Sequence, residues 1–309
     1  MDRVQVSVDD VRVLRFDDGT PVTAASAVAP LGGGWLVAQD DSTAAAWQRA
    51  GRIDPLRLLP PVEGHDRFTE AAGTKRLKPD LEVACPTDVD GRPAVLLLGS
   101  GSTGRRMRGV LVELADGRPV VSVADLGPLY ARVADRLGLP LDQLNLEGAA
   151  RTGTTLRWFQ RGNLAAGVPS ASVDVPVAAL VEVLLGRAQP DAVAVADPRT
   201  YDLGEVGGVG LAVTDAVALP DGRLLLSAAA EDTPNAVDDG PVVATALVLV
   251  DDAQVVAVAP VPEVDGRVQK VEGLAMRRVG DGSVQLLAVV DADDPGAPSV
   301  QLDLRVVLG

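Results

Sequence analysis

The sequence predicts an all-β fold, a β-propeller of five blades, from the form of its apolar segments and from a signature that recurs along the chain. The apolar segments are short, rich in Val and Leu, and bounded by Gly, Pro and Asp, as in VLLLGSG, ATALVLVDD and VQLLAVVDADD. Segments of this kind are typical of strands rather than helices. The spacing of the signature then predicts the number of blades.

A small or acidic residue recurs directly before such strands, about 60 residues apart. The segments AASAVA, DLEVA, NLEGAA, VTDAVA and VEGLA place Ser26, Glu82, Glu147, Asp215 and Glu272 at one equivalent position. The interval is close to one fifth of the 309 residues, so the repeats divide the chain evenly. This period fits the radial four-stranded sheets of a propeller. Six blades, one of them degenerate, are the alternative.

The N-terminal segment is predicted to close the ring. The last repeat supplies three strands, near VEGLAMRRV, VQLLAVVDA and SVQLDLRVVL, while VQVSVDDVRVLRF precedes the first signature. Because a blade needs four strands, we expect the N-terminal strand to join the last blade. Residues 1–309 then form a single propeller domain.

Two insertions between repeats are predicted to be helical. Residues 125–138 carry an apolar stripe that ends at Gly138. In residues 174–186, Asp174 is placed as the helix cap and Pro176 in the first turn. Both patterns follow the usual start and stop signals of helices.

The composition excludes several classes of function. The chain has 28 Lys+Arg against 43 Asp+Glu, a formal charge of -15, which repels nucleic acids and anionic membranes. Aromatic residues are only 3%, too few for platforms that stack bases or sugars. The single cysteine excludes an internal disulfide and any site built from several thiolates.

The beginning of the chain alternates apolar and polar residues, and no window reaches about 18 uninterrupted apolar residues. We therefore expect a cytoplasmic protein without a signal peptide or a membrane span. No coiled-coil heptads are present that would require a dimer, so we expect a monomer.

The signature acids are the first candidates for a functional site. If the five positions are equivalent, four carboxylates converge beside the innermost strands. Carboxylates that meet out of water repel one another, so their pKa values rise or a cation binds between them. Oxygen ligands from several blades suit Ca²⁺ better than Mg²⁺. The predicted calcium ligands are Glu82, Glu147, Asp215 and Glu272, with neutral oxygens from Asn145, Asn163 and Asn235.

Basic side chains could neutralise the same acids and make a metal unnecessary. The chain has only three lysines, and all of them precede a signature acid: Lys75 and Lys78 lie before Glu82, and Lys270 lies before Glu272. Alternatively, these cations could bind a phosphate or carboxylate of a ligand. The predicted anion-binding residues are Lys78, Lys270, Arg161 and Arg105.

At KPDLEVA, LNLEGAA, RGN, EDTPNAVDDG and QKVEGLA the chain resembles an uncharacterised bacterial family of β-propellers. More distantly it is similar to the phytase-like esterase propellers, in which an E-G-x motif opens blades. The resemblance covers most of the chain and implies the propeller fold. It also implies calcium-assisted hydrolysis of a phosphoester, an ester or a lactone, with metal ligands near the mouth of the channel.

Two functions from different classes follow. In the first, the protein is a hydrolase of a small anionic substrate: a divalent cation polarises the ester or phosphoryl oxygen, and Glu147 or Glu272 acts as the general base. In the second, the protein is a non-catalytic binding or scaffold propeller, and its acidic and basic ring residues form salt bridges that hold the blades together.

Overall fold

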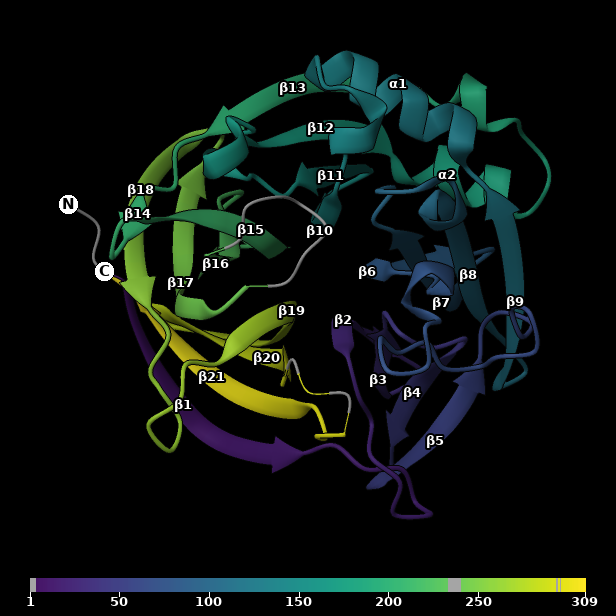
Figure 1. The fold of residues 1–309 in the computed structure, drawn as a ribbon, viewed down its shortest axis with the longest axis horizontal. Helices are drawn as coiled ribbons and strands as arrows, with labels where there is room; N and C mark the ends of the chain where they lie inside the picture. The colour runs from purple at the N-terminus through teal and green to yellow at the C-terminus, as the bar shows by residue number, and fades with distance from the viewer. Residues whose placement is uncertain (1–3, 233–239, 293, 295) are drawn as a thin grey trace.

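Five antiparallel sheets radiate from a central axis in the structure, a computed structural model that describes residues 4–232, 240–292, 294 and 296–309 (Figure 1). One long strand of each sheet lies nearest the axis, and three more follow outward. The prediction of a nearly all-β propeller with five blades is therefore confirmed, and the alternative of six blades is not.

The strands divide among the blades as follows. Blade 1 contains β2 (Ala25–Leu31), β3 (Gly34–Gln39), β4 (Ala44–Arg49) and β5 (Arg52–Arg57). Blade 2 contains β6 (Leu81–Val89), β7 (Arg92–Gly99), β8 (Arg108–Ala115) and β9 (Arg118–Asp125). Blade 3 contains β10 (Leu146–Thr152), β11 (Thr155–Gln160), β12 (Ser170–Pro176) and β13 (Ala196–Tyr201). Blade 4 contains β15 (Val209–Ala218), β16 (Leu224–Glu231), β17 (Val242–Asp251) and β18 (Gln254–Pro260), with the short β14 (Glu205–Val206) beside β15. Blade 5 contains β19 (Lys270–Gly280), β20 (Ser283–Asp291), β21 (Val300–Leu308) and β1 (Val4–Val13).

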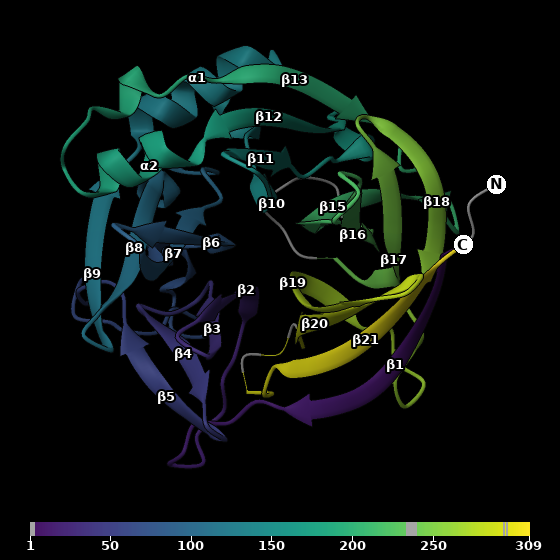
Figure 2. The ribbon, with the colours of Figure 1, turned by 180° about the vertical axis from the view of Figure 1, so that it is seen from behind.

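The N-terminal strand closes the ring, as predicted. Strand β1 pairs antiparallel with β21, from Val4 opposite Leu308 to Val13 opposite Val300. The first strand and the last strand therefore belong to one sheet, and both views show them side by side (Figure 2). Among the described residues, no helix has both the length and the apolar character that crossing a membrane requires.

Two α-helices lie at the periphery, beside blades 2 and 3 (Figure 2). Helix α1 (Gly127–Leu137) connects these two blades and ends at Gly138, whose φ of 69° lies in the left-handed region that terminates helices. Helix α2 (Val177–Leu184) connects β12 to β13. It therefore belongs to blade 3, whereas the sequence placed it between repeats.

The predicted cap of α2 is also wrong. The helix begins after Pro176, and Asp174 remains in strand β12. Its carboxylate lies 3.0 Å from Arg157 and 3.1 Å from Arg199. These two ion pairs with neighbouring strands hold Asp174 in the sheet.

Five short 3₁₀ helices occur in the connections of the described residues: η1 (Lys75–Leu77), η2 (Gly104–Arg106), η3 (Leu141–Gln143), η4 (Leu164–Ala166) and η5 (Pro190–Ala192). The core between the blades consists mainly of Val, Leu and Ala. Within it the rings of Tyr130 and Trp158 pack edge to face, with their centroids 4.9 Å apart.

The innermost strands approach one another most closely at two glycines. A Cβ at Gly148 would lie 2.4 Å from the Cα of Asp215, and one at Gly273 would lie 2.7 Å from the Cα of Ala27. Gly148 also has a φ of +105°, which side chains rarely adopt. Glycine at these positions therefore allows neighbouring blades to meet at the axis.

We expect Gly148→Ala to lower the free energy of unfolding by about 2–3 kcal/mol, because it adds a steric overlap to the cost of a positive φ. Gly153→Ala is the matched control, since Gly153 has a φ of +61° and no atom within 4 Å of the position of a Cβ. The control should cost only about 1 kcal/mol. Urea unfolding of both variants measures the difference, and equal losses would contradict the close contact.

Candidate functional site

The signature residues lie on the five innermost strands, each of which has a β-bulge at this point. In four blades the bulge leaves the predicted residue without a partner across the strand pair: Ser26, Glu82, Glu147 and Glu272. Bulges of this kind redirect a side chain relative to the sheet. The signature is therefore a structural feature of the fold.

In blade 4 the bulged residue is Thr214 rather than Asp215. The hydroxyl groups show the same equivalence, since Ser26 Oγ donates to the carbonyl of Leu81 at 2.5 Å and Thr214 Oγ1 donates to that of Val271 at 2.6 Å. Each acceptor directly precedes the signature acid of the following blade. The assumed equivalence of Asp215 is therefore wrong by one residue.

Asp215 makes contacts within the framework of the blades. Its Oδ1 accepts the N–H of Ala149 in β10 at 3.2 Å, and its Oδ2 accepts that of Leu274 in β19 at 2.7 Å. Burial raises the pKa of Asp215 to about 8, against the lowering effect of these backbone donors. Its carboxylate thus connects the inner strands of blades 3 and 5, and Asp215 is not among the residues that line the cavity described next.

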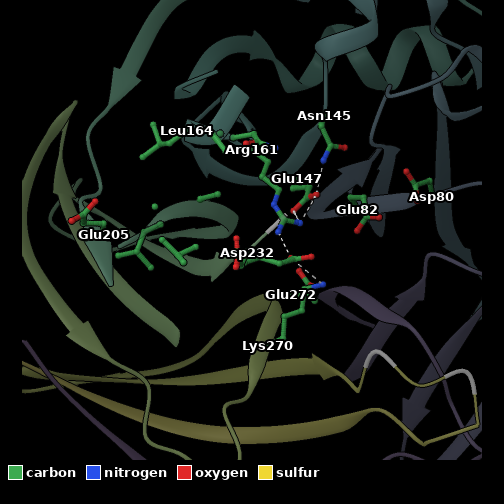
Figure 3. A pocket seen from close by; sticks show the side chains of 18 of the residues that line it. Asp80, Glu82, Asn145, Glu147, Arg161, Leu164, Glu205, Asp232, Lys270 and Glu272 are labelled. Carbon is green, nitrogen blue, oxygen red and sulfur yellow. Dashed lines mark hydrogen bonds and ion pairs between the residues drawn. The ribbon is translucent and has the colours of Figure 1, made fainter. Parts of the chain in front are cut away.

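A cavity of ≈ 570 Å³ lies on the axis, at one end of the innermost strands (Figure 3). It brings together eight of the predicted site residues: Lys78, Glu82, Asn145, Glu147, Arg161, Asn163, Lys270 and Glu272. Arg105 does not line it, since its exposed side chain pairs with Glu63 at 3.5 Å, and the neighbouring Arg106 lines the cavity instead. Asn235 lies outside the described residues.

One group of acids lies at the side of blades 1 and 2, and we call it the acidic triad: Asp40, which follows β3, Asp80, which precedes β6, and Glu82 within β6. One oxygen of each lies within 4.8 Å of the others. Lys78 Nζ lies 2.5 Å from Asp40 and 2.6 Å from Asp80, and Arg106 Nη1 lies 2.8 Å from Asp80. Two of the three acids are therefore compensated by cations.

The pKa values of this group reflect its pairing. Burial opposes the charge of Lys78, but the carboxylates of Asp40 and Asp80 raise the lysine pKa well above its usual value. Burial also acts against ionisation of Asp80, and the charges of Lys78 and Arg106 nevertheless lower its pKa. The ammonium of Lys78 is thus held charged between two carboxylates.

Glu82 differs from the other two acids. Within the described part of the chain, no hydrogen bond or ion pair reaches its carboxylate. Burial, and then the charges of Asp80 and Asp40, raise the pKa of Glu82 well above its usual value. A half-buried carboxyl of this kind either holds a proton or attracts a cation.

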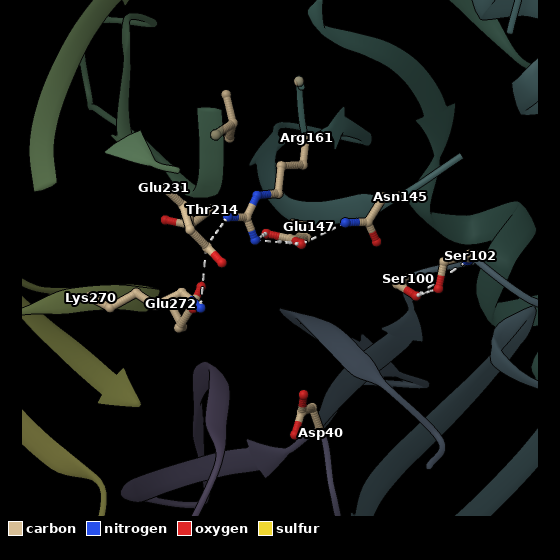
Figure 4. A network of polar contacts seen from close by, with 12 residues as sticks. Asp40, Ser100, Ser102, Asn145, Glu147, Arg161, Thr214, Glu231, Lys270 and Glu272 are labelled. Atoms are coloured by element: carbon tan, nitrogen blue, oxygen red, sulfur yellow. Dashed lines mark hydrogen bonds and ion pairs between the residues drawn. The ribbon is translucent and has the colours of Figure 1, made fainter. Parts of the chain in front are cut away.

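A second group lies at the side of blades 3, 4 and 5 (Figure 4). Arg161, which follows β11, donates from Nη1 to both oxygens of Glu147 at 3.0 and 3.1 Å, and its Nη2 pairs with Glu231. Lys270 Nζ lies 3.4 Å from Glu231 and 3.1 Å from Glu272. Three acids on three blades therefore share two cations.

Glu147 has a neutral hydrogen-bond donor beside it as well as a cation. Asn145 Nδ2 donates to its Oε1 at 2.8 Å, in addition to the contact with Arg161. Burial raises the pKa of Glu147 to about 7, although the charge of Arg161 lowers it. A carboxyl with this pKa can exchange a proton near neutral pH.

The charges around the cavity do not balance. The carboxylates of the two groups are Asp40, Asp80, Glu82, Glu147, Glu231 and Glu272, and the cations are Lys78, Arg106, Arg161 and Lys270. Glu205, Asp232, Lys75 and Arg76 also line the cavity, so eight acids, Asp40 included, face six cations and leave a formal excess of two negative charges. A divalent cation would neutralise this excess.

The sets of calcium ligands and anion-binding residues predicted above did not include Asp40, Asp80, Arg106 or Glu231. Asp40 and Glu231 stand in the polar clusters QDD and EDT, directly after or at the end of the second strand of a blade. Because the second strand runs antiparallel to the first, it ends at the level where the first strand begins. This position was the signal that could have identified both residues.

Five radial sheets around a charged axial cavity define the protein as a five-bladed β-propeller with a polar site at the mouth of its channel. Residues 74–295 match a family of unknown function, DUF6910, and the chain belongs to that family. The expected resemblance to an uncharacterised propeller family is thus confirmed. No curated protein matches the sequence.

Solved structures with a similar fold have low sequence identity. A gluconolactonase from Xanthomonas campestris is 13% identical, with a TM-score of 0.40, over 89% of this chain and 69% of that one. A luciferin-regenerating enzyme is 10% identical, with a TM-score of 0.39, over 93% and 78%. A hypothetical protein from Leishmania major is 11% identical, with a TM-score of 0.46, over 96% and 90%.

Proposed function

We propose that the axial cavity is the active site of a hydrolase that depends on a divalent cation, Ca²⁺, and acts on a small anionic ester, phosphoester or lactone. The observation that carries the proposal is the carboxylate of Glu82, which has no partner within the described residues and lies beside an oxygen of Asp40 and one of Asp80. The excess of negative charge around the cavity supports a cationic occupant.

The donor set fits calcium in its chemistry. The acidic triad offers three carboxylate oxygens, which are hard ligands of the type that Ca²⁺ prefers, and the cavity has room for waters and substrate oxygens to complete the shell. Lys78 competes with the cation because it already pairs with Asp40 and Asp80. Binding at Glu82 therefore requires the ammonium to withdraw from one of these acids.

When bound, the cation would polarise the ester or phosphoryl oxygen of the substrate. Glu147 would then take a proton from the attacking water, since its pKa is about 7. Arg161 holds both oxygens of Glu147 and thereby fixes the orientation of this base. Arg161 and Lys270 also supply positive charge for the anionic group of the substrate. Glu272, paired with Lys270, is the second candidate for the base.

A second function, that of a non-catalytic binding or scaffold propeller, is favoured by the pattern of ion pairs. Lys78 pairs with Asp40 of blade 1, Arg161 of blade 3 pairs with Glu231 of blade 4, and Lys270 of blade 5 pairs with the same Glu231. These contacts cross from blade to blade near the axis. In this function they would hold the ring together without a metal.

The metal content of the purified protein distinguishes the two functions. We expect mass spectrometry to find about one calcium per chain. Added Ca²⁺ should raise the melting temperature of EDTA-treated protein, because binding at a concentration 100 times Kd stabilises the folded state by about 2.7 kcal/mol. Glu82→Gln should abolish the rise. Glu182→Gln, in an exposed pair on α2, should retain it. No metal and no rise in the unaltered protein would favour the scaffold.

A further inference from the structure

The cavity has two sides of different chemistry. The acids and cations described above surround one side, whereas an apolar wall, with the exposed Glu205 beside it, forms the other. We define this apolar wall as Leu164 and Ala165 of η4 with Val209, Gly210, Leu211 and Ala212 of β15. Figure 3 shows Leu164 on the side of Glu205, across the cavity from Asp80 and Glu82.

Leu164 is exposed, although the loop that carries it is well held. Its side chain is 56% exposed. The loop is closed by the N–H of Asn163 on the carbonyl of Val168 at 2.7 Å and by the reverse bond at 2.9 Å. Asn163 Oδ1 also accepts the N–H of Ala166 at 3.1 Å. The fold therefore presents an apolar side chain to solvent on a loop that is closed by backbone hydrogen bonds.

The position of Leu164 depends on a glycine in the neighbouring strand. A Cβ at Gly210 would lie 2.4 Å from Leu164 Cδ1, so a larger residue at this position would displace the leucine side chain from its place over β15. Ala212 is two residues from Gly210, so it lies on the same face of β15, whereas Leu211 packs in a buried core cluster. Leu164, packed over Gly210, and Ala212 thus both contribute to the apolar lining of the cavity.

We propose that this apolar wall binds an alkyl or aryl group of the ligand, while the charged side of the cavity holds its polar group. The two surfaces belong to one cavity, so one molecule with a polar head and an apolar tail can contact both. The binding of the ligand's anionic group through calcium rests on the proposed function. The binding of its apolar group rests on the apolar wall alone.

The test is calorimetric titration of methyl-, butyl- and hexylphosphonate, which cannot be hydrolysed, into protein with Ca²⁺. Each methylene buried on the wall should tighten Kd up to about fourfold. In Leu164→Ser the gain with chain length should largely disappear while Kd for methylphosphonate is unchanged. Leu141→Ser is the matched control, because Leu141 is also an exposed leucine, 41% exposed, and does not line the cavity.

A parallel titration separates failure of this inference from failure of the proposed function. This experiment titrates methyl-, butyl- and hexylammonium into the protein in EDTA. Without a metal, the ammonium group of these ligands would pair with the excess negative charge around the cavity. If phosphonates do not bind but alkylammonium ions tighten with chain length, and Leu164→Ser removes this gain, the wall is supported and the calcium hydrolase is not. If neither series tightens with chain length, or if Leu164→Ser behaves like Leu141→Ser, the apolar subsite is wrong.

Discussion

Arg161→Gln is expected to lower the free energy of unfolding by about 3–5 kcal/mol at pH 8, because it leaves buried acids without their cation. Arg161 pairs with Glu147 and with Glu231, whose side chains are only 10% and 4% exposed. Lys270 remains beside Glu231, but no second cation contacts Glu147 among the described residues. Glu147 therefore accounts for most of the expected loss.

The loss should depend on pH in a direction that the pKa of Glu147 determines. Burial raises this pKa from 4.5 to about 7. When the pKa of a carboxyl is higher in the folded than in the unfolded protein, the folded state becomes less stable as the pH rises from the unfolded pKa to the folded pKa. Without Arg161 the folded pKa rises further and the loss continues to higher pH. The difference between variant and unaltered protein should therefore be smaller at pH 5 than at pH 8.

Urea unfolding at the two pH values measures this effect. Arg187→Gln is the control, because Arg187 forms an exposed pair with Glu182 and should contribute no more than about 0.5 kcal/mol at either pH. A loss for Arg161→Gln as small as that of the control would mean that Glu147 is solvated and that the ion pairs around the axis do not hold the blades.

The sequence was sufficient for the architecture because the repeat length and the strand pattern are properties of the chain alone. The closing of the ring by β1 followed from a count of strands in the last repeat. The one-residue error at Asp215 arose because Ser26 and Thr214 carry out the same contact with a hydroxyl group. A pattern that looks for acids aligns Asp215 instead. Only the register of the bulge distinguishes the two residues.

The convergence of Glu82, Glu147 and Glu272 on one cavity also followed from their equivalent positions. The pairing of these acids did not, because it depends on distances between blades. Lys78 could be placed near Glu82 from the sequence, yet it pairs with Asp40 and Asp80 and leaves Glu82 without an ion pair in the described chain. Whether a metal ion or basic side chains neutralise these acids therefore depends on contacts between blades, which the spacing of residues in the sequence does not predict.

Glu147→Gln is expected to lower kcat for hydrolysis about 10²- to 10⁴-fold, once a substrate has been found among esters, phosphoesters and lactones, because it removes the proposed general base. The amide oxygen can still accept from Asn145 and Arg161 at the position of Oε1, although the contact of Arg161 with the second oxygen is lost, so the local structure should be largely preserved. A melting temperature close to that of the unaltered protein would verify this. KM should change much less than kcat.

The pH profile of the rate identifies which acid is the base. If Glu147 takes the proton, the rate of the unaltered protein should rise with pH through about 7, where this carboxyl loses its own proton, and then level off. That inflection should vanish in Glu147→Gln and persist in Glu272→Gln. The reverse result would assign the base to Glu272, and an unchanged rate in both variants would remove the general base from this cavity. Glu182→Gln should match the unaltered protein throughout, since its side chain lies on the outer helix α2.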